Sequence, residues 1–565
     1  MARFDPVEEN RLLAKELWSE AGFEVRCEDG LCDDITDDVL HPVGCVRQAA
    51  AEGLAKLLED RPASKTASIL DVLLATYHEK LEMIPPVIDH LGRTVEPAID
   101  HWEPRSGIGM SLTKLAPLFD AQMVEKAVSF FVPGGLGDRN ESVRKCMLEA
   151  AVVTINLHGK DTAEELLPVF EGFMEKAPSL SGTYDDVRQS VVILMGSLAK
   201  HLDTSDPKVR PIMRQLIVAL NTPSQQVQEA VANCLPPLVP TIKEEAPDIV
   251  SNLINTLLKE DRSYGERKGA AYGIAGIVKG LGILSLKQLD IMGRLTEAIQ
   301  NKKSPTHREG ALFAFEMLCG MLGRLFEPYI VHILPHLLLC FGDSVQHVRE
   351  AADDTARAVM SKLSAHGVKL VLPSLLNALE EDQWRTKTGS VELLGAMAFC
   401  APKQLSSCLP SIVPKLIEVL SDSHHKVQKA GAQALKVIGS VIRNPEIQAI
   451  VPILLKALAD PAQKTGPCLQ TLLDTKFVHF IDAPSLALIM PVVQRAFKDR
   501  STETRKMAAQ IIGNMYSLTD EKDLSPYLPG IIPGLKNSLL DPVPEVRAVS
   551  ARALGAMVKG MGESR

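Results

Sequence analysis

The sequence predicts an all-α solenoid of HEAT or armadillo type, with about thirteen helix pairs in a single superhelix. A short motif recurs about every forty residues, close to the period of HEAT and armadillo units. Ala-rich helices alternate with Leu- and Ile-rich ones, as expected when neighbouring pairs bury each other's apolar faces. At 565 residues, with 46% hydrophobic but only 4% aromatic residues, the chain suits a stack of thin helical layers better than one globular core.

The last copy of the motif, DPVPEVRAVSARALG at residues 541–555, shows how each unit is built. Its small apolar residues are spaced three and four positions apart, which places them on one buried face of a helix. Pro544 suits the first position of that helix, and Asp541-Pro542 ends the helix before it. The copy therefore predicts a helix, a short turn and a second helix. The buried face consists of Val546, Val549, Ser550, Ala553 and Leu554.

Most copies carry an arginine at the same position, just after the turn. These arginines are Arg47, Arg105, Arg144, Arg188, Arg267, Arg308, Arg349, Arg385, Arg505 and Arg547, with Gln228 and Gln428 in two further copies. The interval from Gln428 to Arg505 is about two periods long, and residues 460–474 fill it as a copy without arginine. We expect each arginine to bind an acidic or carbonyl group in the adjacent turn. This arginine ladder is therefore predicted to be structural rather than a ligand contact.

The predicted organisation has four parts. Residues 1–34 contain a partial repeat with one helix and the start of an acidic connector, CEDGLCDDITDD. Residues 35–370 form a HEAT array, residues 371–560 continue it, and residues 561–565 form a tail. Neither end shows the polar cap that terminal repeats need, so we expect a segment of a longer array.

One interval breaks the period near the N-terminus. Arg47 and Arg105 lie further apart than one repeat. The excess indicates either an insertion or a longer helix around residues 68–82.

The sequence contains only partial matches to motifs that bind nucleotides, other cofactors or metal ions. Gly159-Lys160 is followed by Asp161 and lacks the first glycine of a P-loop, so no nucleotide site is expected. The glycine-rich run at residues 273–283 continues a helical copy and favours close helix packing over a dinucleotide loop. His332 and His336 have helical spacing, but Pro335 interrupts them and no third ligand follows. We predict no catalysis, no cofactor and no metal.

The net charge and the cysteines limit which partners and which cell compartment are expected for the protein. The net charge of −9 argues against general coating of nucleic acid, and no DNA partner is expected, although a local basic patch is compatible with it. The ten cysteines form no CxxC or zinc pattern, which indicates reduced thiols in a cytosolic or nuclear protein. The longest uncharged run, residues 328–342, is short for a membrane span and contains a proline, so no membrane partner is expected.

Several segments resemble a known family. Residues 444–461, 478–518 and 524–554, with WRTKTGSVELLG at 384–395, are similar to the HEAT region of fungal translation elongation factor three, over about residues 371–560. With ERKGAAYGIAGIVKGLGI at 266–283, the whole chain resembles the Gcn1 family of ribosome-associated HEAT proteins.

The resemblance implies a function. Members of the Gcn1 family bind stalled or collided ribosomes and promote activation of the Gcn2 kinase, which phosphorylates the alpha subunit of translation initiation factor two. It implies a cytoplasmic, ribosome-associated, non-enzymatic scaffold, because the ATP-binding cassettes of the elongation factor are absent. Kinase contact is expected through regions outside this segment. Two alternatives stay open: a HEAT scaffold for nuclear transport or phosphatase assembly, and a tubulin-binding array, for which linkers between groups of repeats are missing.

Two basic turns are candidates for contact with ribosomal RNA and ribosomal proteins. Turns project from the edge of a solenoid, where flexible cations reach phosphates without reading sequence. The alternative is that these turns are merely solvated. The first turn is expected to hold Lys302, Lys303 and His307, and the second Lys498, Arg500 and Lys506.

Overall fold

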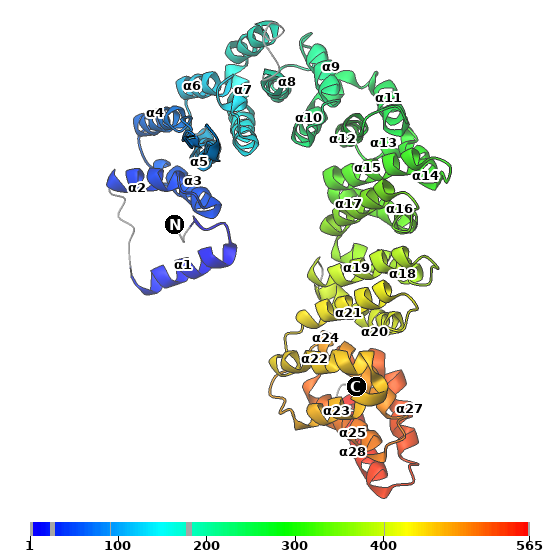
Figure 1. The fold of residues 1–565 in the computed structure, drawn as a ribbon. Coiled ribbons are helices and arrows are strands. Elements are labelled where there is room, and N and C mark those ends of the chain that lie inside the picture. The colour runs from blue at the N-terminus through cyan, green and yellow to red at the C-terminus, as the bar shows by residue number, and fades with distance from the viewer. Residues whose placement is uncertain (1–3, 23–28, 91, 177–183, 401, 563–565) are drawn as a thin grey trace. The chain divides into compact units, whose positions relative to one another are not determined.

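The computed structural model describes residues 4–22, 29–90, 92–176, 184–400 and 402–562. Within these ranges the chain is helical, with one two-stranded sheet. It divides into two compact units, and Figure 1 labels their elements along the chain. The first unit comprises residues 1–256 and 262–282, and the second comprises residues 257–261 and 283–565.

The first unit contains the helices up to α12, and from Leu257 the end of α11 belongs to the second unit. The helices are α1 (Glu8–Glu20), α2 (Asp29–Val39), α3 (Gly44–Leu58), α4 (Ala63–Glu79), α5 (Glu103–Leu115), α6 (Ala121–Phe131), α7 (Glu141–Lys176), α8 (Tyr184–Ala199), α9 (Val209–Ala219), α10 (Gln225–Leu238), α11 (Ala246–Leu258) and α12 (Tyr264–Leu281). Single 3-10 turns follow as η2 (Ala116–Leu118), η3 (Gly135–Gly137) and η5 (Val239–Ile242).

Second helices stack on second helices in this unit. Helix α3 packs on α5, α5 on α7, α7 on α8, α8 on α10, and α10 on α12. Glycine permits the closest approaches: a Cβ at Gly269 would lie 1.8 Å from the main-chain oxygen of Leu220, and one at Gly107 would lie 1.9 Å from that of Val39. The predicted tight packing of the glycine-rich run is confirmed, because a Cβ at Gly273, Gly276 or Gly280 of α12 would lie less than 3 Å from a neighbouring residue.

The long interval between Arg47 and Arg105 contains an insertion. Strands β1 (Val87–Ile88) and β2 (Thr94–Glu96) form an antiparallel hairpin between α4 and α5, extended by a bridge between Ile84 and Ile99. Of the two alternatives, the insertion is therefore correct, and α4 ends at Glu79. The strand side chains are exposed, so the hairpin lies outside the helical core.

The second unit contains the remaining helices. They are α13 (Ser285–Gln288), α14 (Ile291–Gln300), α15 (Pro305–Leu322), α16 (Glu327–Cys340), α17 (Gln346–Lys362), α18 (Ala365–Ala378), α19 (Trp384–Cys400), α20 (Pro402–Val419), α21 (His425–Ser440), α22 (Pro445–Ala459), α23 (Pro461–Asp474), α24 (Ala483–Ala496), α25 (Thr502–Met515), α26 (Glu521–Leu524), α27 (Leu528–Ser538) and α28 (Pro544–Gly562). The 3-10 turns are η6 (Gly323–Phe326), η7 (Tyr516–Leu518) and η8 (Ser525–Tyr527).

In the second unit, second helices again stack on second helices, but this order changes after α21. Second helices α15, α17, α19 and α21 pack in succession, as Figure 1 shows, and first helices α16, α18 and α20 do the same. Beyond them α20 packs on α24, while α22 packs on both α23 and α24. The copy predicted at residues 460–474 without an arginine is helix α23.

The local sequence accounts for where helices begin. Ser263 accepts the main-chain N–H of Glu266 and the Glu266 carboxylate accepts that of Ser263, a capping box that starts α12. Ser304 accepts the N–H of His307, and Pro305 occupies the first position of α15. Both devices satisfy or remove N–H groups that have no partner inside the helix.

Over the residues that the structure describes, the prediction of about thirteen helix pairs is confirmed. The pairs are α2/α3, α4/α5, α6/α7, α7/α8, α9/α10, α11/α12, α14/α15, α16/α17, α18/α19, α20/α21, α22/α23, α24/α25 and α27/α28, with the long α7 serving two of them.

The predictions for the two ends of the chain need correction. The acidic segment predicted as a connector is helical instead, since residues 29–39 form α2, whose Cys32 and Val39 are buried. The predicted tail begins inside α28, and residues 563–565 lie outside the described residues.

One stretch, Pro305–Cys340, is long and apolar enough to cross a membrane by length and composition. It spans α15, η6 and α16, whose apolar side chains pack inside the second unit. Core helices of water-soluble proteins pass the same test, so this stretch is weak evidence for membrane insertion.

Candidate functional site

At Arg308 and Arg505 the ladder joins one turn to the next helix pair. In α15 the Arg308 guanidinium donates to the main-chain oxygen of Asn301 at 2.8 Å, within its own turn. The same group forms two hydrogen bonds with the carboxylate of Asp343, at 2.7 and 3.1 Å. Burial favours the neutral acid, but the hydrogen bond from Arg308 and that from the Val345 N–H outweigh it, so the pKa of Asp343 lies below its ordinary value.

The sequence analysis expected an acidic or carbonyl partner for these arginines, but it did not identify the aspartate that supplies the carboxylate. In α25 Arg505 donates to the main-chain oxygen of Asp499 at 2.9 Å and to the carboxylate of Asp541 at 2.8 Å. An aspartate precedes the ladder residue by six positions in several copies, and this spacing was a visible signal. The aspartate and ladder residue pairs are Asp138 and Arg144, Asp343 and Arg349, Asp422 and Gln428, Asp499 and Arg505, and Asp541 and Arg547.

The ladder residues differ in what they contact. Those that donate to carbonyl oxygens of their own turn are Arg47, Arg144, Arg308, Arg349, Arg505 and Arg547, with the amides of Gln228 and Gln428 in the same role. Arg267 is buried in α12. Arg188 lies 3.8 Å from Asp185 on its own helix, and Arg385 is exposed. A structural role for the ladder stays a prediction, which these contacts favour for the first group.

Arg105 forms a buried polar cluster in the first unit. Its guanidinium is fully buried and binds the carboxylates of Asp100, at 2.7 Å, and Asp138, at 2.8 Å. The Tyr77 hydroxyl donates to Asp138 at 2.6 Å. Hydrogen bonds from Arg105 and then Arg139 hold the pKa of Asp100 well below its usual range, although burial opposes them.

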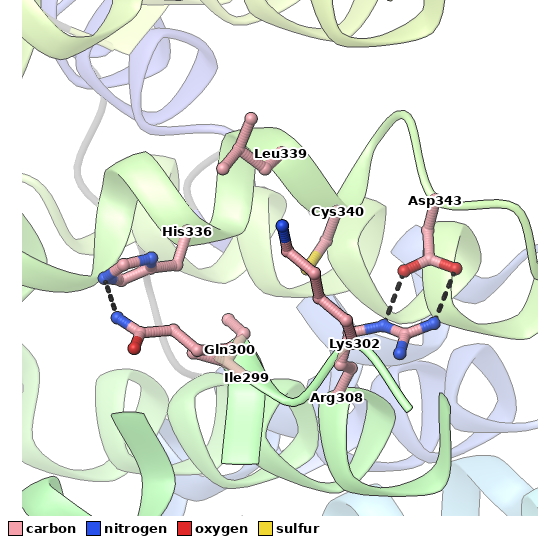
Figure 2. A pocket seen from close by; sticks show the side chains of 8 residues that line it. All are labelled: Ile299, Gln300, Lys302, Arg308, His336, Leu339, Cys340 and Asp343. Carbon is pink, nitrogen blue, oxygen red and sulfur yellow. Dashed lines mark hydrogen bonds and ion pairs between the residues drawn. The ribbon is translucent and has the colours of Figure 1, made fainter. Parts of the chain in front are cut away.

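The first basic turn lies between α14 and α15, beside a pocket of about 490 Å³. Figure 2 shows the Lys302 side chain extending over this pocket, between the contact of Gln300 with His336 and the ion pair of Arg308 with Asp343. Gln300 Nε2 lies 2.9 Å from His336 Nε2, and burial lowers the pKa of His336. The neutral imidazole therefore accepts this hydrogen bond.

The three residues of this turn are not equivalent. Lys302 and Lys303 are exposed, and neither forms an ion pair with any residue that the structure describes. His307 lies inside α15, half-buried, and its Nδ1 is 3.1 Å from the Asn301 amide nitrogen. The prediction that His307 belongs to the turn is wrong, because Ser304 caps α15 three residues earlier.

In the second basic turn, between α24 and α25, two of the predicted residues are again exposed in the turn and the third lies in the following helix. Lys498 and Arg500 are exposed and without ion pairs across the described ranges. Lys506 lies within α25, where its ammonium binds Glu545 at 3.0 Å and approaches Glu503 at 3.6 Å. The prediction that Lys506 belongs to the turn is therefore wrong, and the positive charge of Lys506 is already paired with these glutamates.

Other sequence candidates lie within helices. Gly159 and Lys160 are interior residues of α7 rather than a phosphate-binding loop. His332 and His336 lie on α16. No group of three or more His, Cys, Asp or Glu side chains that could hold a metal ion occurs among the described residues.

Three family models match successive parts of the chain. The model described as "Stalled ribosome sensor GCN1, HEAT repeats" matches residues 1–200. "EF3 N-terminal HEAT repeat" matches residues 267–435, and "Elongation factor 3/GNC1 HEAT repeat" matches residues 463–565. The "Stalled ribosome sensor GCN1" of Homo sapiens is 66% identical over 565 residues, which is 100% of this chain and 21% of that protein. The chain belongs to the GCN1 family.

More distant relatives agree with this membership. The "eIF-2-alpha kinase activator GCN1" of Saccharomyces cerevisiae is 41% identical over 573 residues, covering 100% of the chain and 21% of that protein. "Elongation factor 3" of Gonapodya prolifera is 32% identical over 320 residues, 56% of the chain and 29% of that protein. The likeness of this GCN1-family chain to elongation factor 3 begins at residue 267, well before the expected residue 371. The chain spans about a fifth of the length of its GCN1 relatives.

Proposed function

We propose that this chain is a ribosome-binding segment of a stalled-ribosome sensor and acts as a non-enzymatic HEAT scaffold in translational control. The observation that carries the proposal is 66% identity, over the whole chain, to a protein called "Stalled ribosome sensor GCN1". Other relatives are called "eIF-2-alpha kinase activator GCN1". The proposed outcome is activation of the Gcn2 kinase, through regions outside this segment, on ribosomes in the cytoplasm.

The geometry supports a scaffold that touches RNA locally. The ladder fixes the turns by charged hydrogen bonds, so that exposed side chains on them are held at defined places along each unit. Four of these side chains, Lys302, Lys303, Lys498 and Arg500, carry positive charge without an ion pair in the described part of the chain. With a net charge of −9, the chain would contact RNA phosphates at such turns rather than along a continuous basic surface.

A scaffold for nuclear transport or phosphatase assembly is less favoured. Of four relatives that match the whole chain at 41% identity or more, three carry names of ribosome sensing or kinase activation, and the fourth, from Arabidopsis thaliana, is called "Protein ILITYHIA".

Cosedimentation of the 565-residue chain with purified ribosomes tests the proposal. We expect the chain to pellet with ribosomes, more with collided than with single ones, and to lose binding as salt rises. A pull-down with a small GTPase of nuclear transport serves as the parallel experiment. A chain that stays in the supernatant at low salt, or that is captured by the GTPase instead, would overturn ribosome binding.

A further inference from the structure

One ladder position of the second unit is filled by a different residue from the one predicted. Lys387 of α19 binds the Asp422 carboxylate at 2.9 Å across 35 positions of sequence, as Arg308 binds Asp343 across 35 positions. Lys387 is therefore the ladder residue of the α18/α19 pair. The assignment of Arg385 to the ladder is wrong, because Arg385 makes no hydrogen bond to its turn within the described structure.

Arg385 is held at the surface by an aromatic ring instead. Its guanidinium carbon lies 4.5 Å from the centre of the Trp384 ring, and the Lys426 ammonium of α21 lies 4.9 Å from the same ring. Both cations are exposed, and neither has a carboxylate partner in the residues that the structure covers. Lys415 and Lys506, by contrast, are each bound by two glutamates.

The partner ring in this cluster is fixed by the ladder. The imidazole of His424 stacks on Trp384 with ring centres 4.3 Å apart and planes 5° from parallel. The main-chain N–H of His424 donates to the ladder carboxylate of Asp422 at 2.8 Å, and the ring Nδ1 of His424 accepts the main-chain N–H of Lys426 at 3.2 Å. A neutral ring with Nδ1 as acceptor carries its proton on Nε2, so Nε2 is left to donate outward.

Trp384, Arg385, His424 and Lys426 thus form a Trp384 cluster at the turn edge of α19 and α21, two helices that pack together. The cluster presents a guanidinium, an ammonium and an imidazole N–H beside a stacked pair of rings. All three groups donate hydrogen bonds, and two of them carry positive charge. An anion with several acceptor oxygens matches this set.

We propose that the Trp384 cluster binds the sugar-phosphate backbone of an unpaired stretch of ribosomal RNA; this rests on the proposed ribosome binding. A nucleotide presents phosphate oxygens next to a planar base, and both find complements here, in the cations and the rings. An acidic protein would match the cations with its carboxylates, but its carboxylate side chains have no planar base to pack against the rings. Glu381 and Asp382 in the preceding turn repel a longer anionic chain, so the contact extends over one or two phosphates.

The test uses the 565-residue chain and the double variant Arg385→Glu with Lys426→Glu. The matched control is Lys369→Glu with Lys436→Glu, which makes the same charge change at exposed lysines of α18 and α21 outside the cluster. Binding is measured to a single-stranded RNA oligonucleotide across a salt series, and to ribosomes by cosedimentation. Helicity and melting temperature verify that each variant is folded.

We expect the cluster variant to bind RNA about tenfold more weakly and to lower the slope of log affinity against log salt by about two, while the control changes little. Trp384→Ala should weaken binding to single-stranded RNA more than to a duplex, because unpaired bases can stack. Equal RNA affinity of cluster and control variants would overturn the proposal. The proposal would also be overturned if the cluster variant lost ribosome binding but kept RNA binding, and if polyglutamate displaced the unmodified chain from ribosomes. That result would indicate that the cluster binds an acidic protein.

The two proposals fail separately. If the unmodified chain binds RNA through the cluster but does not pellet with ribosomes, the ribosomal assignment fails with the proposed function. If the chain pellets with ribosomes and the cluster variant pellets like the control, only the Trp384 cluster is excluded.

Discussion

Arg349 donates to the main-chain oxygen of Asp343 at 2.7 Å, while the carboxylate of the same aspartate holds Arg308 of the preceding helix pair. One aspartate thus links two consecutive repeats, through its main chain and its side chain. Each ladder arginine removed from this arrangement leaves an acceptor in a partly buried turn without its donor.

Replacing Arg349 by alanine should lower the free energy of unfolding of the second unit by about 1 to 3 kcal/mol, since the Asp343 carbonyl loses a charged donor. Ribosome binding of the folded chain should not change. Urea denaturation and cosedimentation measure the two effects. The control is Arg357→Ala on the same helix, where the exposed arginine pairs with no described residue except Asp354 and the loss should stay within about 0.5 kcal/mol. Equal effects of the two substitutions would contradict the structural role of Arg349.

The first unit should lose stability in acid through Asp100. Because Arg105 holds the folded-state pKa of Asp100 well below the unfolded value of about 4, its contribution is complete above that pH and disappears as pH falls toward the folded-state pKa. Asp100→Asn should therefore lower stability at neutral pH and flatten the decline below about pH 4. Unfolding midpoints measured from pH 7 to 2 decide this. Asp203→Asn, at an exposed site, provides the control, and an unchanged acid profile for Asp100→Asn would count against the network.

Lys302→Glu with Lys303→Glu should weaken cosedimentation with ribosomes, most visibly at low salt, and reduce the salt dependence. Both side chains are exposed and lack ion pairs to described residues, so melting and helicity should be unchanged. Identical binding of this variant and the unmodified chain across the salt series would remove the first basic turn from the interface. Lys498→Glu with Arg500→Glu would then test the second turn.

Two glycines of the first unit should respond in opposite directions to alanine. At Gly269 the new methyl group would meet the Leu220 carbonyl at 1.8 Å, so α12 must move away from its neighbour, and the unit should be destabilised by more than about 2 kcal/mol. At Gly172, within α7, no described atom beyond the adjoining backbone of its own helix lies within 4 Å of the added carbon, and alanine should stabilise by about 0.5 to 1 kcal/mol. Thermal melting of both variants provides the comparison. Similar shifts at the two sites would disprove the close contact.

The repeat period predicted the helix pairs, because apolar spacing and turn residues are local properties. It missed α2, since six acidic residues from Glu28 to Asp38 obscured the apolar face that buries Cys32 and Val39. The hairpin between α4 and α5 was predicted only as an excess length, because its exposed strands bury no side chains and carry little hydrophobic pattern.

The candidate site was less predictable, because it depends on which charges are paired in three dimensions. Lys506 and Lys498 look alike in sequence, yet only Lys506 lies beside a carboxylate of the next repeat, Glu545. Arg385 fits the motif position better than Lys387, but the distance to Asp422 decides which of them enters the ladder. Contacts between repeats about forty residues apart set these roles, and the recurring aspartate alone does not tell which nearby cation it binds.

The ladder also predicts how the second unit yields under tension. Arg308 with Asp343, Lys387 with Asp422, and Arg505 with Asp541 are latches in series, each closing one joint between neighbouring layers. Under load, the repeat with the weakest packing and ion pair would unfold first, and its roughly forty residues would extend to about 140 Å. Because each repeat contacts only its neighbours, we expect the second unit to lengthen one repeat at a time while its remaining layers stay folded.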